Sequence, residues 1–404
     1  MDVSKKTLDL SRSVYYLWIA YFAAIYMFGN VYYQMPAYFS YIMAFLMLGY
    51  KLFAQGKSGA SGVPGVVTFP VSSLTIWYGL FYLWECIARL WTPDSIAPYS
   101  NTPYQTLRIV AILIAMDLYV VSEEDVQNLI KAFCIGATAF AVWIMVTSPI
   151  SSFGSVLYGA KTGQQRNTTG YVLCFATFFL VYLYKEHKNR IWLIFSLLCF
   201  VSSLLTGSRK IIFAYVAALF LVIIGQEDVN KTVRWFFYIF ITAIIVIPIA
   251  YQIPYIRETF GERLLAILDD SISDSSIFYR NIAKENAIRI FKESPIIGNG
   301  WAAVRNSFVY KGVSIYAHNN YLEIAADYGI IGCLLFFLRN FVYGFKCFIR
   351  VKKNFCFLTA TVLLASMILL DWGQVSYIYV FLMCIWGVIY KFVEFECVDP
   401  EGSR

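Results

Sequence analysis

Charged residues are scarce in this chain, and histidine is scarcer still. Only 14% of the 404 residues are Asp, Glu, Lys or Arg, whereas 59% are hydrophobic and the mean hydropathy is +0.63. A soluble domain carries about 25% charged residues, so these values exclude a water-soluble globule. The apolar residues come in long blocks, and a block of about 20 can cross a bilayer. The composition therefore predicts a protein that lies mostly within a lipid bilayer.

Residue clusters that could hold a metal ion or a disulfide framework are also lacking. The nine cysteines are scattered without any CxxC pair, and the two histidines, His187 and His318, lie far apart. We therefore expect no metal and no other cofactor. The net charge of +7 is explained by basic residues in cytoplasmic loops. No basic run interleaved with aromatics occurs in a polar segment, so nucleic acid is not an expected partner.

The apolar blocks predict an all-α polytopic membrane protein with about 12 transmembrane helices. The candidate spans are 14–33, 36–53, 71–91, 104–121, 128–147, 169–184, 191–206, 211–225, 235–254, 328–345, 355–370 and 374–393. The basic residues of the short loops favour cytoplasmic termini. Three regions are expected. They are a membrane domain with the first nine spans (1–254), one large exterior loop (255–327), and the last three spans with a short cytoplasmic tail (328–404).

The exterior loop is expected to be helical. Apolar residues at helical spacing predict an amphipathic helix on the membrane surface, at Ile256, Phe260, Leu264 and Leu268. A second helix should run from about Ser275 to Ser294, where Pro295 and Gly298 stop it. A third, short helix should begin after Asn319–Asn320 and end at Gly329.

Several polar residues at the expected exterior surface could carry chemistry. His318 precedes a helix, where a lone histidine is either a structural hydrogen-bonding residue or a general base. Arg209 and Lys210 form a tight turn between two spans, either as an interfacial pair or as an anion site. Arg280 lies on the second loop helix, on a solvated face or in a site. Solvated faces are expected for Arg257, Arg263, Arg289 and Arg305.

Charges inside spans are a further candidate group, because intramembrane ionisable residues are costly. Glu85 and Arg89 are four residues apart, so they can pair on one helix face or serve a site near the exterior surface. Other embedded or nearly embedded charges are Arg108, Asp117, Arg339 and Asp371.

Four segments resemble the O-antigen ligase and polymerase superfamily. The resemblance is carried by His318-Asn319-Asn320-Tyr321-Leu322-Glu323 with the following Asp327-Tyr328-Gly329-Ile330-Ile331-Gly332, by Ile296-Ile297-Gly298-Asn299-Gly300, by Thr206-Gly207-Ser208-Arg209-Lys210, and by Arg280. The first resembles the signature of the superfamily, and the third its Ser-Arg turn between two spans. The resemblance covers roughly 200–345, and Arg166 aligns only loosely.

The resemblance implies a bacterial inner-membrane glycosyltransferase whose active site faces the periplasm or the exterior. Its donor would be a glycan on undecaprenyl pyrophosphate, and its acceptor a sugar hydroxyl on a lipid-linked repeat unit or on lipid A core. Such enzymes invert the anomeric centre without a metal. His318 would be the catalytic base, and Arg209 and Arg280 would hold the pyrophosphate. Supporting roles would fall to Lys210, Arg89, Arg166 and Glu323, with capping or structure the expected role of Glu323.

Three functions remain open at this point. The His-Asn-Asn-Tyr-Leu-Glu and Thr-Gly-Ser-Arg-Lys segments favour a polymerase of O-antigen, capsule or exopolysaccharide repeat units over a ligase to lipid A core. A polytopic transporter or lipid-linked sugar flippase is the alternative from another class. Transporters are usually built from two repeated halves, whereas this sequence shows no repeat. A chain-length regulator and a flippase are the protein partners that a polymerase would have.

Overall fold

The structure is a computed structural model of the chain. It describes residues 3–28, 35–57, 71–93, 102–149, 166–225, 275–307, 309–310, 313–314 and 316–398, with the single residues 152, 158, 230, 234 and 252. The ninth predicted span, 235–254, lies outside the described residues except for position 252, and so does the amphipathic helix expected around Ile256–Leu268.

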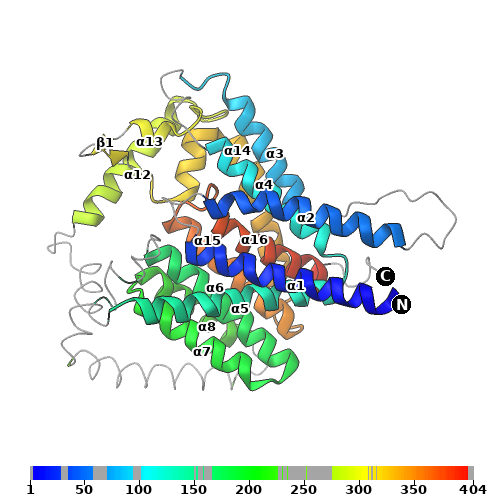
Figure 1. Ribbon diagram of the computed structural model, residues 1–404. Coiled ribbons are helices and arrows are strands. Elements are labelled where there is room, and N and C mark those ends of the chain that lie inside the picture. The colour runs from blue at the N-terminus through cyan, green and yellow to red at the C-terminus, as the bar shows by residue number, and fades with distance from the viewer. Residues whose placement is uncertain are drawn as a thin grey trace.

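The described residues form helices and one short hairpin (Figure 1). The elements are α1 (Val3–Phe28), α2 (Met35–Lys57), α3 (Ser73–Ala88), α4 (Thr102–Tyr119), α5 (Glu123–Thr147), α6 (Arg166–His187), α7 (Arg190–Leu205), α8 (Arg209–Ile224), α12 (Ser275–Glu293), α13 (Ala303–Ser307), β1 (Val309–Tyr310), β2 (Val313–Ser314), α14 (Asn320–Phe348), α15 (Phe355–Gly373), α16 (Val380–Val393) and the π-helical turn Glu394–Val398.

Every predicted span other than 235–254 coincides with one of these helices. Within the described residues, α5, α6, α14 and α15 are long and apolar enough to cross a membrane, and further apolar helices are shorter. The pair α7 and α8 is a tight hairpin, with Gly207 in the left-handed region at φ 62° between them. Two helices rather than one kinked span were expected there, and the hairpin confirms this.

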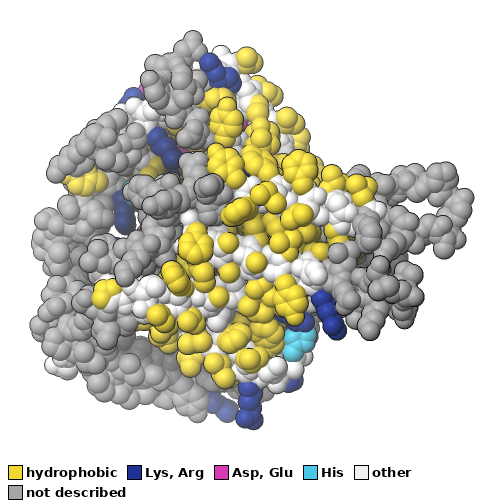
Figure 2. All heavy atoms as spheres, viewed as in Figure 1, with side chains coloured by type: hydrophobic (Ala, Val, Ile, Leu, Met, Phe, Trp, Pro, Cys, Tyr) yellow, Lys and Arg dark blue, Asp and Glu magenta, His cyan; other side chains and the backbone are white. Residues whose placement is uncertain are grey.

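The core of the bundle is built around α16. Every residue from Val380 to Val393 is buried, and the helix packs against α4, α5, α6 and α15. The outside of the bundle is apolar as well: Phe45, Val146 and Phe345 expose 75%, 79% and 67% of their surface. Figure 2 shows such hydrophobic side chains spread over a broad face of the molecule. Soluble monomers rarely expose apolar patches of this extent, so the surface indicates a multi-pass membrane protein.

A small polar subdomain covers one end of the bundle, beside α3 and α14 and away from the two chain termini (Figure 1). It consists of α12, α13 and the hairpin, in which Val309 pairs with Ser314 and Tyr310 with Val313. The second loop helix was predicted at about 275–294 and is observed as α12, whereas the hairpin was not predicted. A second hydrophobic cluster, separate from the main core, attaches α12 to α13 and α14; its buried members are Ala287, Ile290, Ala303, Val304, Ala317 and Ala326.

A break at Gly329 divides α14 into a polar first part and an apolar second part. Gly329 has φ 68° and ψ −169°, and the helix resumes beyond it. Residues 295–300 form backbone hydrogen bonds with α14 on both sides of the break: Gly300 N donates to Asp327 O at 2.9 Å, and Ile330 N donates to Pro295 O at 2.9 Å. A Cβ on Gly298 or Gly329 would lie within 2.3 Å of the opposing backbone. The two glycine-containing segments of the family resemblance therefore meet as one backbone junction, which only glycine permits.

Candidate functional site

The turn between α7 and α8 packs against the start of α6. Ser208 Oγ donates to Asn167 Oδ1 at 2.8 Å, and Thr206 Oγ1 lies 3.0 Å from the position that a Cβ on Gly170 would take. This close approach brings Arg166, the first residue of α6, to the same end of the bundle as Arg209. The positive end of the α8 dipole also lies at this end of the bundle, which favours an anion.

Lys210 lies at the centre of a group of cations. Its Nζ donates to Gly373 O at the end of α15. The pKa of Lys210 is lowered to about 7, mainly by burial and then by the charges of Arg280, Lys284, Arg166 and Arg209, in that order. Folding has therefore concentrated positive charge from α6, α8 and α12 in one place. We call these five residues the basic cluster.

Helix α12 supplies two members of the basic cluster. Arg280 and Lys284 are four residues apart, so they share one helix face. The buried residues Ala283, Ala287 and Ile290 form the neighbouring face, which holds α12 on the rest of the subdomain. Sequence reasoning selected Arg280 but missed Lys284, which the i, i+4 spacing would have identified once Arg280 was chosen.

His318 is half-buried next to the basic cluster, with its backbone in the left-handed region at φ 53°. Non-glycine residues adopt this conformation rarely, often at functional sites. Its ring packs on Tyr316, with 3.9 Å between the ring centroids. Burial lowers the pKa of His318 to about 3, and nearby Arg280, Lys210, Lys284 and Arg305 act in the same direction. The imidazole is therefore neutral in the unliganded protein at physiological pH.

The helix start just after His318 is rigidly built. Asn319 is the N-cap of α14 and accepts from Leu322 N at 3.0 Å, as expected for an asparagine at this position. Glu323 is fully buried; it accepts from Ala317 N at 2.6 Å and pairs with Arg305 Nε at 2.7 Å. Glu323 thus holds the backbone before His318, which agrees with the structural role expected for it.

Arg305 was expected on a solvated face, and this expectation is wrong. Its side chain is only 25% exposed, and the ion pair with buried Glu323 raises its pKa. The guanidinium also lies over the Tyr316 ring, 5.7 Å from its centroid. Arg305 lies on α13, which has only five residues, too few for the spacing of apolar residues to identify the buried face of the helix. In contrast, Arg289 is exposed as expected.

A buried polar network joins α14, the helix that begins just after His318, to the end of α15 and the α15–α16 connection. Asp371 Oδ1 accepts from Asn320 Nδ2 at 3.1 Å and from Ser376 Oγ at 2.6 Å, while Ser376 N donates to Asn320 Oδ1 at 3.2 Å. Asp371 is two residues from Gly373, the partner of Lys210. The network therefore holds the His318 segment and the Lys210 contact in one rigid unit. Sequence reasoning flagged Asp371 as an embedded charge without finding this role.

Two of the remaining candidates are Arg89 and His187. Arg89 Nη1 donates to Thr92 O at 3.2 Å, and its guanidinium lies 5.9 Å from the Trp301 ring centroid. Trp301 Nε1 donates to Glu85 O at 2.6 Å. Arg89 therefore stands where the polar subdomain attaches to α3. His187 is exposed at the last position of α6.

The chemistry of this site suits an anion. Among the described residues, no group of three His, Cys, Asp or Glu side chains is arranged to hold a metal ion; the independence from metal stays a prediction. The basic cluster brings five cations together, and arginine offers paired N–H donors that match phosphate oxygens. A neutral imidazole beside bound phosphate could take a proton from a nearby hydroxyl.

Comparison with known proteins agrees with this geometry. Residues 194–337 match the family model described as O-Antigen ligase. No curated protein matches the chain. The matched segment includes Arg209, Lys210, Arg280 and the stretch from His318 to Glu323, whereas Arg89 and Arg166 precede it. The match confirms the resemblance to the O-antigen ligase and polymerase superfamily and supports a membrane enzyme of that general type.

Proposed function

Starting from a chain whose residues 194–337 match the O-antigen ligase family, we propose that this protein is a polyprenyl-diphosphate-dependent glycosyltransferase. Its donor is a glycan on undecaprenyl pyrophosphate, and its acceptor is a sugar hydroxyl. The observation that carries the proposal is the placement of a neutral imidazole next to Lys210, Arg280 and Lys284 of the basic cluster. The polyprenyl chain would lie in the bilayer.

In the proposed reaction, the acceptor oxygen attacks the anomeric carbon while His318 takes the hydroxyl proton. The bond between the anomeric carbon and the pyrophosphate oxygen breaks, and its electron pair leaves with undecaprenyl pyrophosphate. Attack opposite the leaving group inverts the anomeric centre. Arg209 and Arg280 stabilise the charge that develops on the pyrophosphate, and Lys210, Arg166 and Lys284 add to the field. Such placed donors are most effective at charge that forms in the transition state.

The low pKa of His318 makes proton removal by this residue depend on binding of the donor. A base with a pKa of about 3 is a weak proton acceptor. Because nearby cations contribute to this low value, a pyrophosphate that neutralises them raises the pKa of His318 toward its usual range. The imidazole becomes a stronger base only when the leaving group is in place, so proton removal is coupled to donor binding.

The acceptor decides between polymerase and ligase. We favour polymerisation of surface-polysaccharide repeat units, because the His318 and Arg209 segments resemble polymerases more closely. In this proposal the protein resides in the bacterial inner membrane with both termini in the cytoplasm and the basic cluster outside. Transfer to lipid A core is the second candidate. A transporter or flippase would not need a base beside the anion site, and this disfavours that class.

Purified protein in nanodiscs tests the proposal directly. With a lipid-linked repeat unit as donor and acceptor, a polymerase lengthens the glycan without an ion gradient or nucleotide. Addition of a chelator should leave the rate unchanged. Elongation that requires a gradient would indicate a transporter, and transfer only to lipid A core would indicate a ligase. Absence of any transfer by well-folded protein, with either the lipid-linked repeat unit or lipid A core as acceptor, would refute the glycosyltransferase assignment.

A further inference from the structure

A hollow lies in the polar subdomain, on the side of α12 away from the basic cluster. Its walls are the C-terminal half of α12, the segment 297–299 and α13, with Trp91 and Pro93 at its rim. We call it the distal pocket. Its volume is about 520 Å³, within the roughly 300–1,000 Å³ typical of small-molecule sites. No member of the basic cluster lines it.

The distal pocket combines an aromatic side chain with several exposed polar ones. Arg289 Nη1 pairs with Glu293 Oε1 at 2.8 Å, and more than half of each side chain is exposed. Asn306 and Ser307 on α13 are exposed as well, and the half-buried Trp91 lies at the rim. Each polar group also bonds within the protein: Arg289 Nη2 donates to Asn286 Oδ1, Asn306 Nδ2 to Ala302 O and Ser307 Oγ to Val304 O, all at 2.8 Å. The pocket offers the remaining hydrogen-bonding capacity of these exposed groups, together with part of an indole ring.

The balance of charge separates this pocket from the basic cluster. Arg289 and Glu293 neutralise each other, so the pocket has no excess charge to attract a pyrophosphate. A neutral ligand with many hydroxyl groups fits better, because each hydroxyl both donates and accepts. The C–H face of a sugar ring can pack on an aromatic ring such as Trp91. These features together are those of a saccharide site.

The distal pocket is mechanically joined to the segment that carries His318. Asn299, in the pocket wall, donates from its backbone N–H to Ala326 O at 3.0 Å. The adjoining Gly300 N donates to Asp327 O, so this wall and the first part of α14 form one unit. Helix α12 presents Arg280 and Lys284 on one flank and Arg289 and Glu293 on another. An extended glycan whose end reacts at His318 can therefore follow the same subdomain to the pocket.

We propose that the distal pocket binds a saccharide unit of the glycan, remote from the reacting sugar. This inference rests on the proposed glycosyltransferase function and adds a binding subsite to it. The saccharide belongs either to the acceptor or to the donor glycan, and the experiment separates the two. Binding far from the reacting atoms lowers the KM for a long glycan, and its contribution to kcat is smaller when ground state and transition state are bound equally.

Two variants and a matched control test this site. Arg289→Ala with Glu293→Ala removes the charged pair, and Asn306→Trp fills the hollow. Glu285→Ala with Lys292→Ala is the control, since it removes one acid and one base from exposed positions of the same helix outside the pocket. All of these side chains are exposed, so the fold should tolerate each change.

The first readout is direct binding of the donor glycan freed from its lipid by mild acid. This probe lacks pyrophosphate, so it reports on the saccharide alone. Saturation-transfer NMR with protein in nanodiscs should show binding by wild type and by the control. The double alanine variant should bind about tenfold more weakly, as expected for losing one hydrogen bond with a charged group. Asn306→Trp should also weaken binding, because the indole occupies the hollow.

The second readout is elongation kinetics. The KM should rise in both pocket variants with little change in kcat: for the acceptor if the pocket holds acceptor sugars, or for the lipid-linked donor if it holds donor sugars. Equal binding and equal KM in the variants and the control would overturn the inference. His318→Ala separates the two proposals, because it should abolish transfer while the freed glycan still binds. If wild type neither elongates nor transfers glycan but still binds it, the proposed function fails and the saccharide site stands.

Discussion

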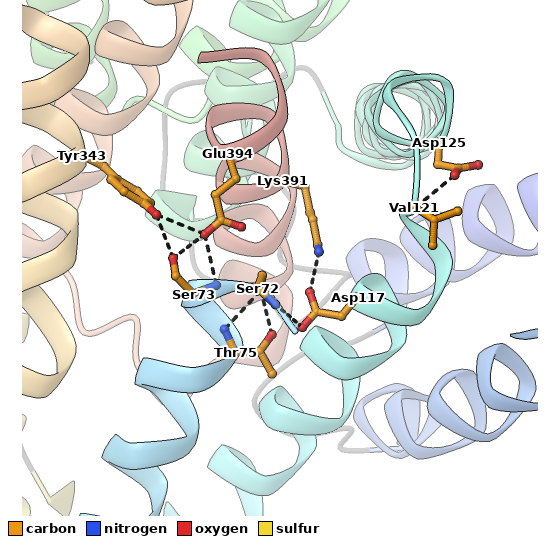
Figure 3. A network of polar contacts seen from close by, with 9 residues as sticks. All are labelled: Ser72, Ser73, Thr75, Asp117, Val121, Asp125, Tyr343, Lys391 and Glu394. Atoms are coloured by element: carbon orange, nitrogen blue, oxygen red, sulfur yellow. Dashed lines mark hydrogen bonds and ion pairs between the residues drawn. The ribbon is translucent and has the colours of Figure 1, made fainter. Parts of the chain in front are cut away.

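The two ends of the helix bundle differ in the charged residues that they bring together. At one end, which we call the Asp117 end, Asp117 pairs with Lys391 at 2.6 Å and accepts from Ser72 N at 3.0 Å. Ser73 donates to Glu394 through both its backbone N–H and its hydroxyl, as Figure 3 shows. At the other end, the basic cluster gathers like charges around Lys210 and His318.

This difference separates structural charge from functional charge. The acid and the base at the Asp117 end match each other, so that end needs no ligand to be stable. At the His318 end the described residues bring several cations close together, and their charges lower the pKa of Lys210. Groups whose pKa values are strongly perturbed are often found at functional sites. The comparison therefore predicts that substitutions at the His318 end change activity, while those at the Asp117 end change stability.

The largest effect is expected from His318. Because a positioned base contributes about 10²–10⁴-fold to the rate, His318→Ala should lose most glycan elongation while the protein still folds and inserts. His187→Ala, at the exposed end of α6, is the matched control and should be nearly silent. Elongation from a lipid-linked donor at equal protein levels measures both. Wild-type rates in His318→Ala, or loss of activity only in His187→Ala, would show that the base lies elsewhere.

The second-largest loss of activity is expected from substitutions of the arginines of the basic cluster. Removal of one donor that stabilises transition-state charge costs about 10²–10³-fold, so Arg209→Ala and Arg280→Ala should each be impaired to that extent. Lysine keeps the charge but lacks the paired donors, so Arg209→Lys and Arg280→Lys should be intermediate. Rates should be measured with saturating donor. If both alanine variants turn over like wild type, these arginines are interfacial residues only.

At the Asp117 end the expected loss is in stability. Asp117→Asn leaves Lys391 buried beside a neutral amide and should lower the free energy of unfolding by about 3–5 kcal/mol. Replacing both partners, Asp117→Asn with Lys391→Met, should recover much of this loss because no buried charge remains. Denaturation of the detergent-solubilised variants measures the effect. A drop in activity per folded molecule with unchanged stability would contradict the structural role.

A smaller effect is expected in the pH dependence. A histidine base is active when neutral, so activity falls as the pH drops through its pKa. In the free protein that pKa is about 3, so kcat/KM should have no acid limb near pH 6.5. Donor binding raises the pKa of His318, so kcat should begin to fall at a higher pH than kcat/KM does. Acid limbs at the same pH would show that His318 and the anion site are not coupled.

The side of the membrane on which each end of the bundle lies can be tested without measuring activity. We expect the His318 end outside, so a cysteine at exposed Ser307 should react with an impermeant thiol reagent in intact cells. Lys188→Cys, in the α6–α7 connection, should react only after lysis. Both need a background without the native cysteines. The opposite labelling pattern would reverse the topology.

The helices, the α7–α8 turn and the start of α14 could be predicted from the sequence because they depend on local signals. Apolar blocks marked the helices, Gly207 with two adjacent charges marked the α7–α8 turn, and Asn319 before an apolar run marked a helix start. The capping geometry of Asn319 and the end of α12 near Ser294 agree with these predictions. Each of these features is decided within a few residues of chain.

What only the tertiary structure decided is which distant residues meet. Lys284 and Arg166 join Arg209 because α12 and α6 pack at the same end, and no local pattern specifies that packing. Arg305 is only partly exposed because it forms an ion pair with the buried Glu323, 18 residues later in the chain. Asp371 was an isolated embedded charge in the sequence, and it became the acceptor that joins Asn320 and Ser376. Charge and periodicity are local properties of the chain, whereas burial and partnership arise only when the helices pack.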